Sequence, residues 1–252
     1  KFLSGPRAER AAVARVCTDA LLSGALRTPR QSAETAKSGV ALRLVIDGRT
    51  LLESPSTECS DEESALRAAF ASIWGAEVAA SALSVRGARS IAKEGDPVVP
   101  GADTELITVH GLAASPEHRR GTRGGVRLFV NRRPVESRRL QHAVEQAYAD
   151  LLPARKFPIA ACFVDLPSRR IDVNVHPTKA EVKLQDEGAA FGLIQQAVRA
   201  ALLGLETPQP STPDLVRSHG TPTLPDYLRR NSAPRGATQG FDSESGSWPG
   251  ES

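Results

Sequence analysis

The sequence predicts an α+β fold, with helices packed on one face of a mostly antiparallel or mixed sheet. Helix-type and strand-type apolar patterns alternate along residues 1–205, without an internal repeat. Residues 40–54 alternate apolar and polar side chains around Asp47-Gly48, which is the signature of a β-hairpin. A mixed order of elements that includes hairpins favours helices gathered on one side of a sheet.

Apolar residues recur at helical spacing in four segments. The second segment has the clearest ends, because Ser60 and Glu63 form a capping box and Gly75 closes the helix. Pro153 is expected to end the third. The apolar face of the first helix consists of Ala12, Val13, Val16, Ala20 and Leu21. The other three helices are expected at residues 60–75, 138–153 and 187–205.

Alternating apolar residues predict the remaining strands. Pro177 stops one of them, because proline cannot donate to a β-ladder. A new strand is expected after Lys179, with Val182 and Leu184 facing inward. The strands before it are expected at 105–113, 125–131, 158–167 and 170–177, the last two joined by a short Ser-Arg-Arg turn.

The composition excludes several classes of protein. The sequence has no run of 18 apolar residues and no signal-peptide pattern, so we expect no membrane partner. Its three cysteines are far apart, which favours reduced thiols over disulfides or a zinc site, so no metal ligands are predicted. It lacks GxSxG, HExxH, Walker A and GxGxxG motifs, and we therefore do not expect an enzyme that works on its own.

Positive charge is concentrated between residues 117 and 139, which hold eight arginines and two glutamates, whereas the whole chain has a net charge of +3. Arginine binds phosphate with two parallel hydrogen bonds and stays charged at any working pH. The stretch holds one aromatic residue, Phe129, which argues for contact with the phosphate backbone and against stacking on bases. A solvated, arginine-rich surface is the alternative. The candidate DNA-binding residues are Arg119, Arg120, Arg123, Arg132, Arg133, Arg138 and Arg139.

A second candidate site is the segment "DVNVHPTKAEVKL", residues 172–184. Because Pro177 ends the preceding strand, Thr178 and Lys179 are expected on a loop. A lysine at a loop tip is suited to reach a phosphate, although a plain solvated lysine is the alternative reading.

Three segments together resemble the MutL family of DNA mismatch repair proteins: the opening "KFLSGPRAE", "LFVNRRPVESRRLQHAVEQAY" and "RIDVNVHPTKAEVKL". They occur in the order and at the spacing of that family, over residues 1–203. Two positions depart from its pattern. Arg132 stands where many relatives carry glycine, so a turn needing φ > 0 there would be strained. Ser4 stands where a basic residue is common.

The resemblance implies a ribosomal protein S5 domain 2-like fold, the transducer domain that follows the ATPase domain in the GHKL ATPase family. Residues 1–7 would be the remnant of the junction with that ATPase domain, and residues 8–205 the transducer domain. Residues 206–252 are expected to be a disordered linker, because Pro, Ser, Gly and Thr make up just over half of them.

The resemblance also implies roles for individual residues. Lys179 would contact the γ-phosphate of ATP across the domain boundary, as the end of an ATP loop formed by His176, Pro177, Thr178 and Lys179. Arg138 matches the DNA-binding arginine of the family.

The cofactors and partners follow in the same way. ATP and magnesium would be bound by the full-length protein and neither by this chain alone, so the chain would be an ATPase fragment without activity of its own. The implied partners are duplex DNA without sequence preference, a MutS-type mismatch sensor and a second copy of the full-length protein. The implied location is the bacterial cytoplasm, at the nucleoid. A free-standing S5-like nucleic-acid-binding module with no ATP role remains the alternative.

Overall fold

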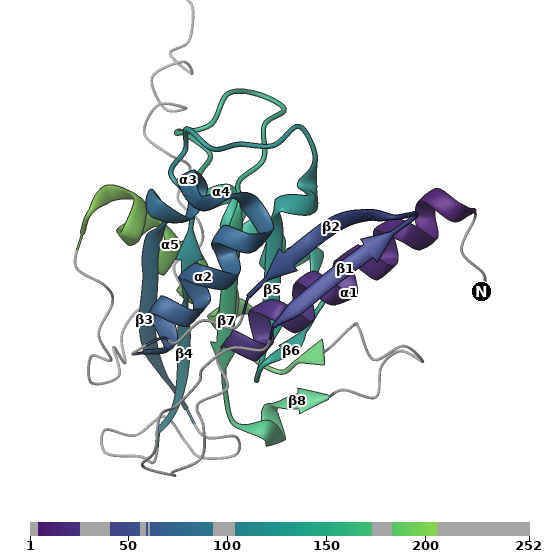
Figure 1. Ribbon diagram of the computed structural model, residues 1–252. Helices are drawn as coiled ribbons and strands as arrows, with labels where there is room; N and C mark the ends of the chain where they lie inside the picture. The colour runs from purple at the N-terminus through teal and green to yellow at the C-terminus, as the bar shows by residue number, and fades with distance from the viewer. Residues whose placement is uncertain are drawn as a thin grey trace, which may run out of the picture. The chain divides into compact units, whose positions relative to one another are not determined.

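The computed structural model describes residues 5–25, 41–55, 59, 61–92, 104–172 and 183–205 (Figure 1). The chain separates into two compact units, Lys1–Asp214 and Leu215–Ser252, and every described residue lies in the first. The predicted linker at 206–252 and the predicted ATP loop at 176–179 fall outside the described residues.

A mixed five-stranded sheet forms the centre of the first unit. The strands lie in the order β3-β4-β7-β5-β6 (Figure 1). Neighbours are antiparallel except β5 and β7, which run parallel. The mixed α+β class that the sequence predicts is therefore confirmed. The strands are β3 (Leu83–Ala92), β4 (Thr104–Ala113), β5 (Val126–Val130), β6 (Arg133–Pro134) and β7 (Ala160–Asp165).

Helices cover both faces of this sheet, whereas we expected them on one. Helices α4 (Arg138–Ala147) and α5 (Glu187–Leu203) pack on one face, against a core that includes Cys162 and Val164. The opposite face is covered by α1 (Pro6–Ala25), by α2 (Glu62–Trp74) and by the hairpin of β1 (Leu42–Ile46) and β2 (Arg49–Ser54), around Ala161 and Phe163 (Figure 1). Both sets of alternating β7 side chains are apolar, so both faces of the strand must be shielded from water.

Several local signals act as the sequence predicts. Asp47 and Gly48 have φ of 51° and 74°, the two left-handed positions of a type I′ turn between β1 and β2. Gly75 ends α2 with φ of 104°. The N-cap of α2 is Asp61 in place of the expected Ser60, since the Asp61 side chain accepts a hydrogen bond of 2.8 Å from the backbone N–H of Ser64.

Other elements differ from expectation. Helix α4 ends at Ala147, well before Pro153. The next residue, Tyr148, is fully buried, and its hydroxyl donates to the carbonyl of Ala114 at 2.6 Å. The expected apolar face of α1 is only partly buried, since Val13 and Val16 are 41% and 67% exposed. Strand β3 and the short helix α3 (Ala76–Ala80) were not predicted.

The last short elements lead toward the predicted ATP loop. A 3₁₀ turn, η2 (Ser168–Arg170), joins β7 to β8 (Ile171–Asp172), which pairs antiparallel with β9 (Lys183–Leu184). Leu184 is buried, as predicted, and Val182 lies outside the described residues. Residues 173–182, which the structure does not describe, connect these two strands.

Candidate nucleic-acid interface

The seven candidate DNA-binding arginines lie at three places on the first unit, and all are exposed. The first place is the loop between β4 and the 3₁₀ turn η1 (Arg123–Gly125), where the backbone of Arg120 pairs with that of Phe157 through two hydrogen bonds of 2.9 Å. The second is the β5–β6 turn, and the third is the first turn of α4. The first place holds Arg119 and Arg120 in the loop and Arg123 at the start of η1. The second holds Arg132 in the turn and Arg133 at the start of β6, and the third holds Arg138 and Arg139.

Three of the seven guanidinium groups are paired with carboxylates. Arg123 contacts Glu145 at 3.1 Å and lies over the Phe157 ring, 5.1 Å from its centroid. The other two pairs join Arg132 to Glu62 at 3.4 Å and Arg139 to Glu187 at 3.5 Å. The remaining four, Arg119, Arg120, Arg133 and Arg138, form no ion pair with the residues that the structure describes.

The β5–β6 turn holds its first arginine in an unusual backbone conformation. Asn131 and Arg132 have φ of 45° and 66°, both in the left-handed region. A two-residue hairpin turn of type I′ requires positive φ at both positions, and glycine adopts it without the clash that a Cβ causes. Arg132 therefore occupies, with a positive φ, the position at which many relatives carry glycine.

The start of α4 is positively charged, and the Glu187 carboxylate accepts a hydrogen bond from the Ser137 hydroxyl there at 3.2 Å. Ser137 caps the helix, since its hydroxyl accepts a hydrogen bond of 3.1 Å from the backbone N–H of Leu140. The first turn contains no acidic residue and begins with Arg138 and Arg139. Cations at a helix N-terminus are unfavourable, because the free N–H groups already carry partial positive charge. A bound phosphate would be attracted by both the helix and the two arginines.

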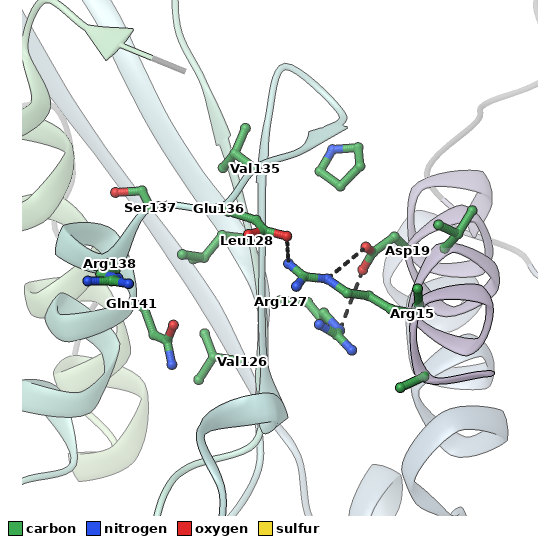
Figure 2. Close-up of a pocket in the computed structure, with 14 residues that line it drawn as sticks. Arg15, Asp19, Val126, Arg127, Leu128, Val135, Glu136, Ser137, Arg138 and Gln141 are labelled. Carbon is green, nitrogen blue, oxygen red and sulfur yellow. Dashed lines mark ion pairs between the residues drawn. The ribbon is translucent and has the colours of Figure 1, made fainter. Parts of the chain in front are cut away.

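A pocket of about 730 Å³ opens between α1 and the β5 edge of the sheet (Figure 2). We name it the α1–β5 pocket, and its polar lining residues are Arg15, Asp19, Arg127, Glu136, Ser137, Arg138 and Gln141. Arg127 lies 3.5 Å from Asp19, and Arg15 contacts Glu136 at 2.7 Å. The pocket thus brings Arg138 together with two other arginines, Arg15 and Arg127. Neither of these two was predicted from the sequence to be a DNA-binding residue. Arg15 precedes Arg127 by more than a hundred residues, so no local pattern could join them.

Burial shifts the pKa values of two side chains in this pocket. Asp19 has 13% of its side chain exposed and Arg127 has 17%. Desolvation, the largest effect, raises the pKa of the Asp19 carboxyl, and Arg127 and Arg15 oppose the rise. Desolvation likewise lowers the pKa of the Arg127 guanidinium, against the attraction of Asp19. Arg15 and Arg120 repel the same guanidinium and add to its shift.

The second candidate site cannot be placed beside the first. His176, Pro177, Thr178 and Lys179 lie outside the described residues, between β8 and β9. Within the described ranges, no group of three His, Cys, Asp or Glu side chains converges where a metal ion could bind. The cysteines are unpaired, and burial raises the pKa of the Cys162 thiol to about 12, which makes it unreactive.

Comparison with known proteins identifies a family that this chain matches. Residues 70–203 match the family model described as "DNA mismatch repair protein, C-terminal domain". Curated proteins named "DNA mismatch repair protein MutL" are similar as well. The one from Phenylobacterium zucineum is 35% identical over 202 residues, which is 80% of this chain and 28% of that protein. The one from Caulobacter vibrioides is 34% identical over 204 residues, which is 81% of this chain and 27% of that protein.

A solved structure supports the fold alone. The crystal structure of the N-terminal domain of a DNA repair protein aligns with a TM-score of 0.55 and 18% identity, over 79% of this chain and 54% of that one.

The α+β architecture with its mixed five-stranded sheet is consistent with the S5-like fold that the resemblance implied. The family match covers more than half of the chain, and the chain therefore belongs to the MutL family of DNA mismatch repair proteins. It spans between a quarter and a third of the length of the curated relatives described above. No helix among the described residues is long and apolar enough to span a bilayer.

Proposed function

We propose that this chain is the DNA-binding and ATP-sensing transducer part of a MutL-type repair ATPase, which couples mismatch recognition to strand processing. The observation that carries the DNA-binding half is the state of Arg138. Arg138 is exposed, is the first residue of α4 and is among the residues that line the α1–β5 pocket. Its guanidinium has no carboxylate partner among the described residues. An arginine can donate two parallel hydrogen bonds to a phosphate, and phosphate contacts carry no sequence information, so we expect binding to be independent of sequence.

The ATP-sensing half rests on the sequence of residues 173–182, which lie between β8 and β9 in the chain. Lys179 would contact the γ-phosphate of an ATP molecule that another part of the protein holds together with magnesium. A positive group aimed at that phosphate stabilises the charge that shifts during hydrolysis. It also links two domains only while the γ-phosphate is present, which makes the lysine a sensor as well. The chain alone would not hydrolyse ATP.

The proposed partners follow from the family. They are duplex DNA, a MutS-type mismatch sensor and a second copy of the full-length protein, in the bacterial cytoplasm at the nucleoid.

DNA binding can be tested with the chain itself, by fluorescence anisotropy of a labelled duplex of mixed sequence. Affinity should fall steeply between about 50 and 200 mM salt, because each phosphate contact releases counterions. The expected loss of affinity over that range is roughly three- to four-fold for each phosphate contact. Arg138→Glu with Arg139→Glu should nearly abolish binding. A matched control changes the charge equally at exposed residues of the β1–β2 hairpin, Arg43→Glu with Arg49→Glu. Equal losses in both double variants, or binding insensitive to salt, would contradict a specific DNA-binding surface.

The role of Lys179 needs an ATPase domain. A chimera in which this chain replaces the matching residues of the Caulobacter vibrioides relative would supply one. Lys179→Ala in the chimera should slow turnover on the order of 10²-fold, as the loss of one preorganised contact typically does. The melting temperature of the isolated chain should not change. Unchanged turnover would favour the alternative, a nucleic-acid-binding module without an ATP role.

A further inference from the structure

The α1–β5 pocket contains an arginine whose hydrogen-bonding capacity is only partly used. Arg127 is largely buried, and its Nε faces the Oδ1 of Asp19 without forming a hydrogen bond to any described residue. Its ion pair with Asp19 is long, at 3.5 Å. A guanidinium offers five N–H donors, and leaving such donors unsatisfied away from water is unfavourable. Arg127 therefore has donors available for an additional oxyanion.

Arg15 faces Arg127 from α1 across the pocket (Figure 2). It contacts Glu136 at 2.7 Å and Asp19 at 3.9 Å. The Arg15–Glu136 pair is solvent-exposed, with 43% and 55% of the two side chains accessible. Exposed ion pairs of this kind contribute little to stability, so Arg15 can exchange Glu136 for another anion without a large loss.

The pocket has more positive than negative charge. Arg15, Arg127 and Arg138 line it, opposed by Asp19 and Glu136. Arg120 adds to the excess, because it lies close enough to Arg127 to lower the pKa of that guanidinium. The lining contains no aromatic ring, and α1 contributes the small side chains of two alanines. This lining offers donors for a phosphate and no surface on which a base could stack.

We propose that the α1–β5 pocket binds one phosphate of the DNA backbone, with Arg15 and Arg127 as its direct contacts. This assignment rests on the proposed DNA-binding function and extends its surface from Arg138 at the start of α4 across the β5 edge to α1. Glu136 and Asp19 hold the two arginines in position in the absence of DNA. When the phosphate enters, Arg15 leaves Glu136 and donates to the phosphate together with Arg127.

Arg15→Gln tests this proposal with the same labelled duplex. Affinity at 50 mM salt should weaken about 3- to 10-fold, and the slope of log affinity against log salt should fall by about one contact. Glu136→Gln should have the opposite effect and tighten binding by a few-fold, because it frees Arg15 and removes a charge that repels phosphate. Arg43→Gln on β1, where the exposed arginine pairs with Glu53, is the matched control and should leave the slope unchanged.

The outcomes separate this proposal from the function on which it rests. If Arg15→Gln and Glu136→Gln both behave like Arg43→Gln while Arg138→Gln weakens binding, the pocket does not contact phosphate and the DNA-binding function stands. If the unchanged chain does not bind the duplex at all, the proposed function itself is wrong. Calorimetric titration with free ATP tests whether the pocket binds the phosphate of a nucleotide in place of a DNA phosphate. Binding of ATP that Arg15→Gln abolishes would assign the pocket to a nucleotide and overturn the proposal.

Discussion

The side chain of Asn131 forms hydrogen bonds with both backbone groups of Leu166. Its Nδ2 donates to the Leu166 carbonyl at 2.9 Å, and its Oδ1 accepts from the Leu166 N–H at 3.0 Å. The backbone N–H of Asn131 also donates to the carbonyl of Val164 at 2.9 Å. The asparagine side chain thereby continues the parallel pairing of β5 with β7 beyond Val130, the last paired residue of β5.

Asn131→Ala should lower the free energy of unfolding by about 2 kcal/mol. The change removes two partly buried hydrogen bonds and leaves the groups of Leu166 with poorer partners. It also places a plain Cβ at a φ of 45°, where asparagine is tolerated better than alanine. Asn131→Gly is the matched variant, since it loses the same hydrogen bonds and relieves the backbone. Chemical denaturation should find the glycine variant the more stable of the two; the reverse order would show that φ is unimportant there.

Arg132→Gly should stabilise the protein by about 0.5–1 kcal/mol. Its φ of 66° penalises any residue with a Cβ, by roughly 1–2 kcal/mol in the left-handed region. The exposed pair with Glu62, which the change removes, is worth less than that. Arg133→Gly at the next position is the control and should destabilise, because Arg133 lies in strand β6 without a positive φ. A lower melting temperature for Arg132→Gly would mean that the arginine makes contacts worth more than the strain.

Local patterns in the sequence predicted much of this fold. The Asp47-Gly48 turn, for example, depends on residues next to each other. Strand β3 was missed because Gly87 and two arginines interrupt its apolar pattern. The glycine is needed there: a Cβ on Gly87 would lie 3.0 Å from the Cβ of Ala197 on α5, a contact that no local signal reports.

The placement of helices on both faces was, in contrast, visible in principle. Residues 160–164 of β7 are an uninterrupted apolar run, which is typical of a strand shielded on both sides. The α1–β5 pocket could not be predicted from the sequence, because α1 and β5 come together only through tertiary packing. Nor does sequence distinguish a buried arginine from an exposed one, as Arg169 and Arg170 illustrate: their side chains are 58% and 4% exposed.

Arg170→Met should destabilise the protein by about 3 kcal/mol. Arg170 is buried between Glu105 at the start of β4, to which its Nε donates at 2.6 Å, and Asp186 at the start of α5. Removing one member of a buried ion pair leaves the other charge without compensation in a poorly solvated place. Arg169→Gln removes the exposed partner of Glu105 and should change stability by less than about 1 kcal/mol.

A second substitution separates charge from packing in this network. Adding Glu105→Leu to Arg170→Met should recover part of the lost stability, because the carboxylate that has lost its buried partner is then gone. If the double variant is as unstable as the sum of its single variants in thermal denaturation, the two residues do not act as a pair.

His110 should make stability depend on pH below neutrality. Its Nδ1 lies 3.4 Å from Asp165, its ring stacks on Phe163 at a centroid distance of 5.3 Å, and its Nε2 is buried without a partner among the described residues. Burial, the largest effect, lowers the pKa of His110; Asp165 and Glu62 oppose the shift, and Arg132 and Arg86 add to it.

The direction of the pH effect follows from proton binding. An unfolded histidine titrates near 6.5, and the folded protein takes up the proton only at lower pH, so the unfolded state binds more protons in the window between the two values. The stability that His110 contributes is therefore present above about pH 6.5 and is lost as pH falls through the folded pKa. His110→Gln should flatten the fall in melting temperature on acidification over this window. Asp165→Asn should steepen it, because the carboxylate that holds the His110 pKa up is removed. If both variants kept the slope of the unchanged protein, the titration would belong to other groups.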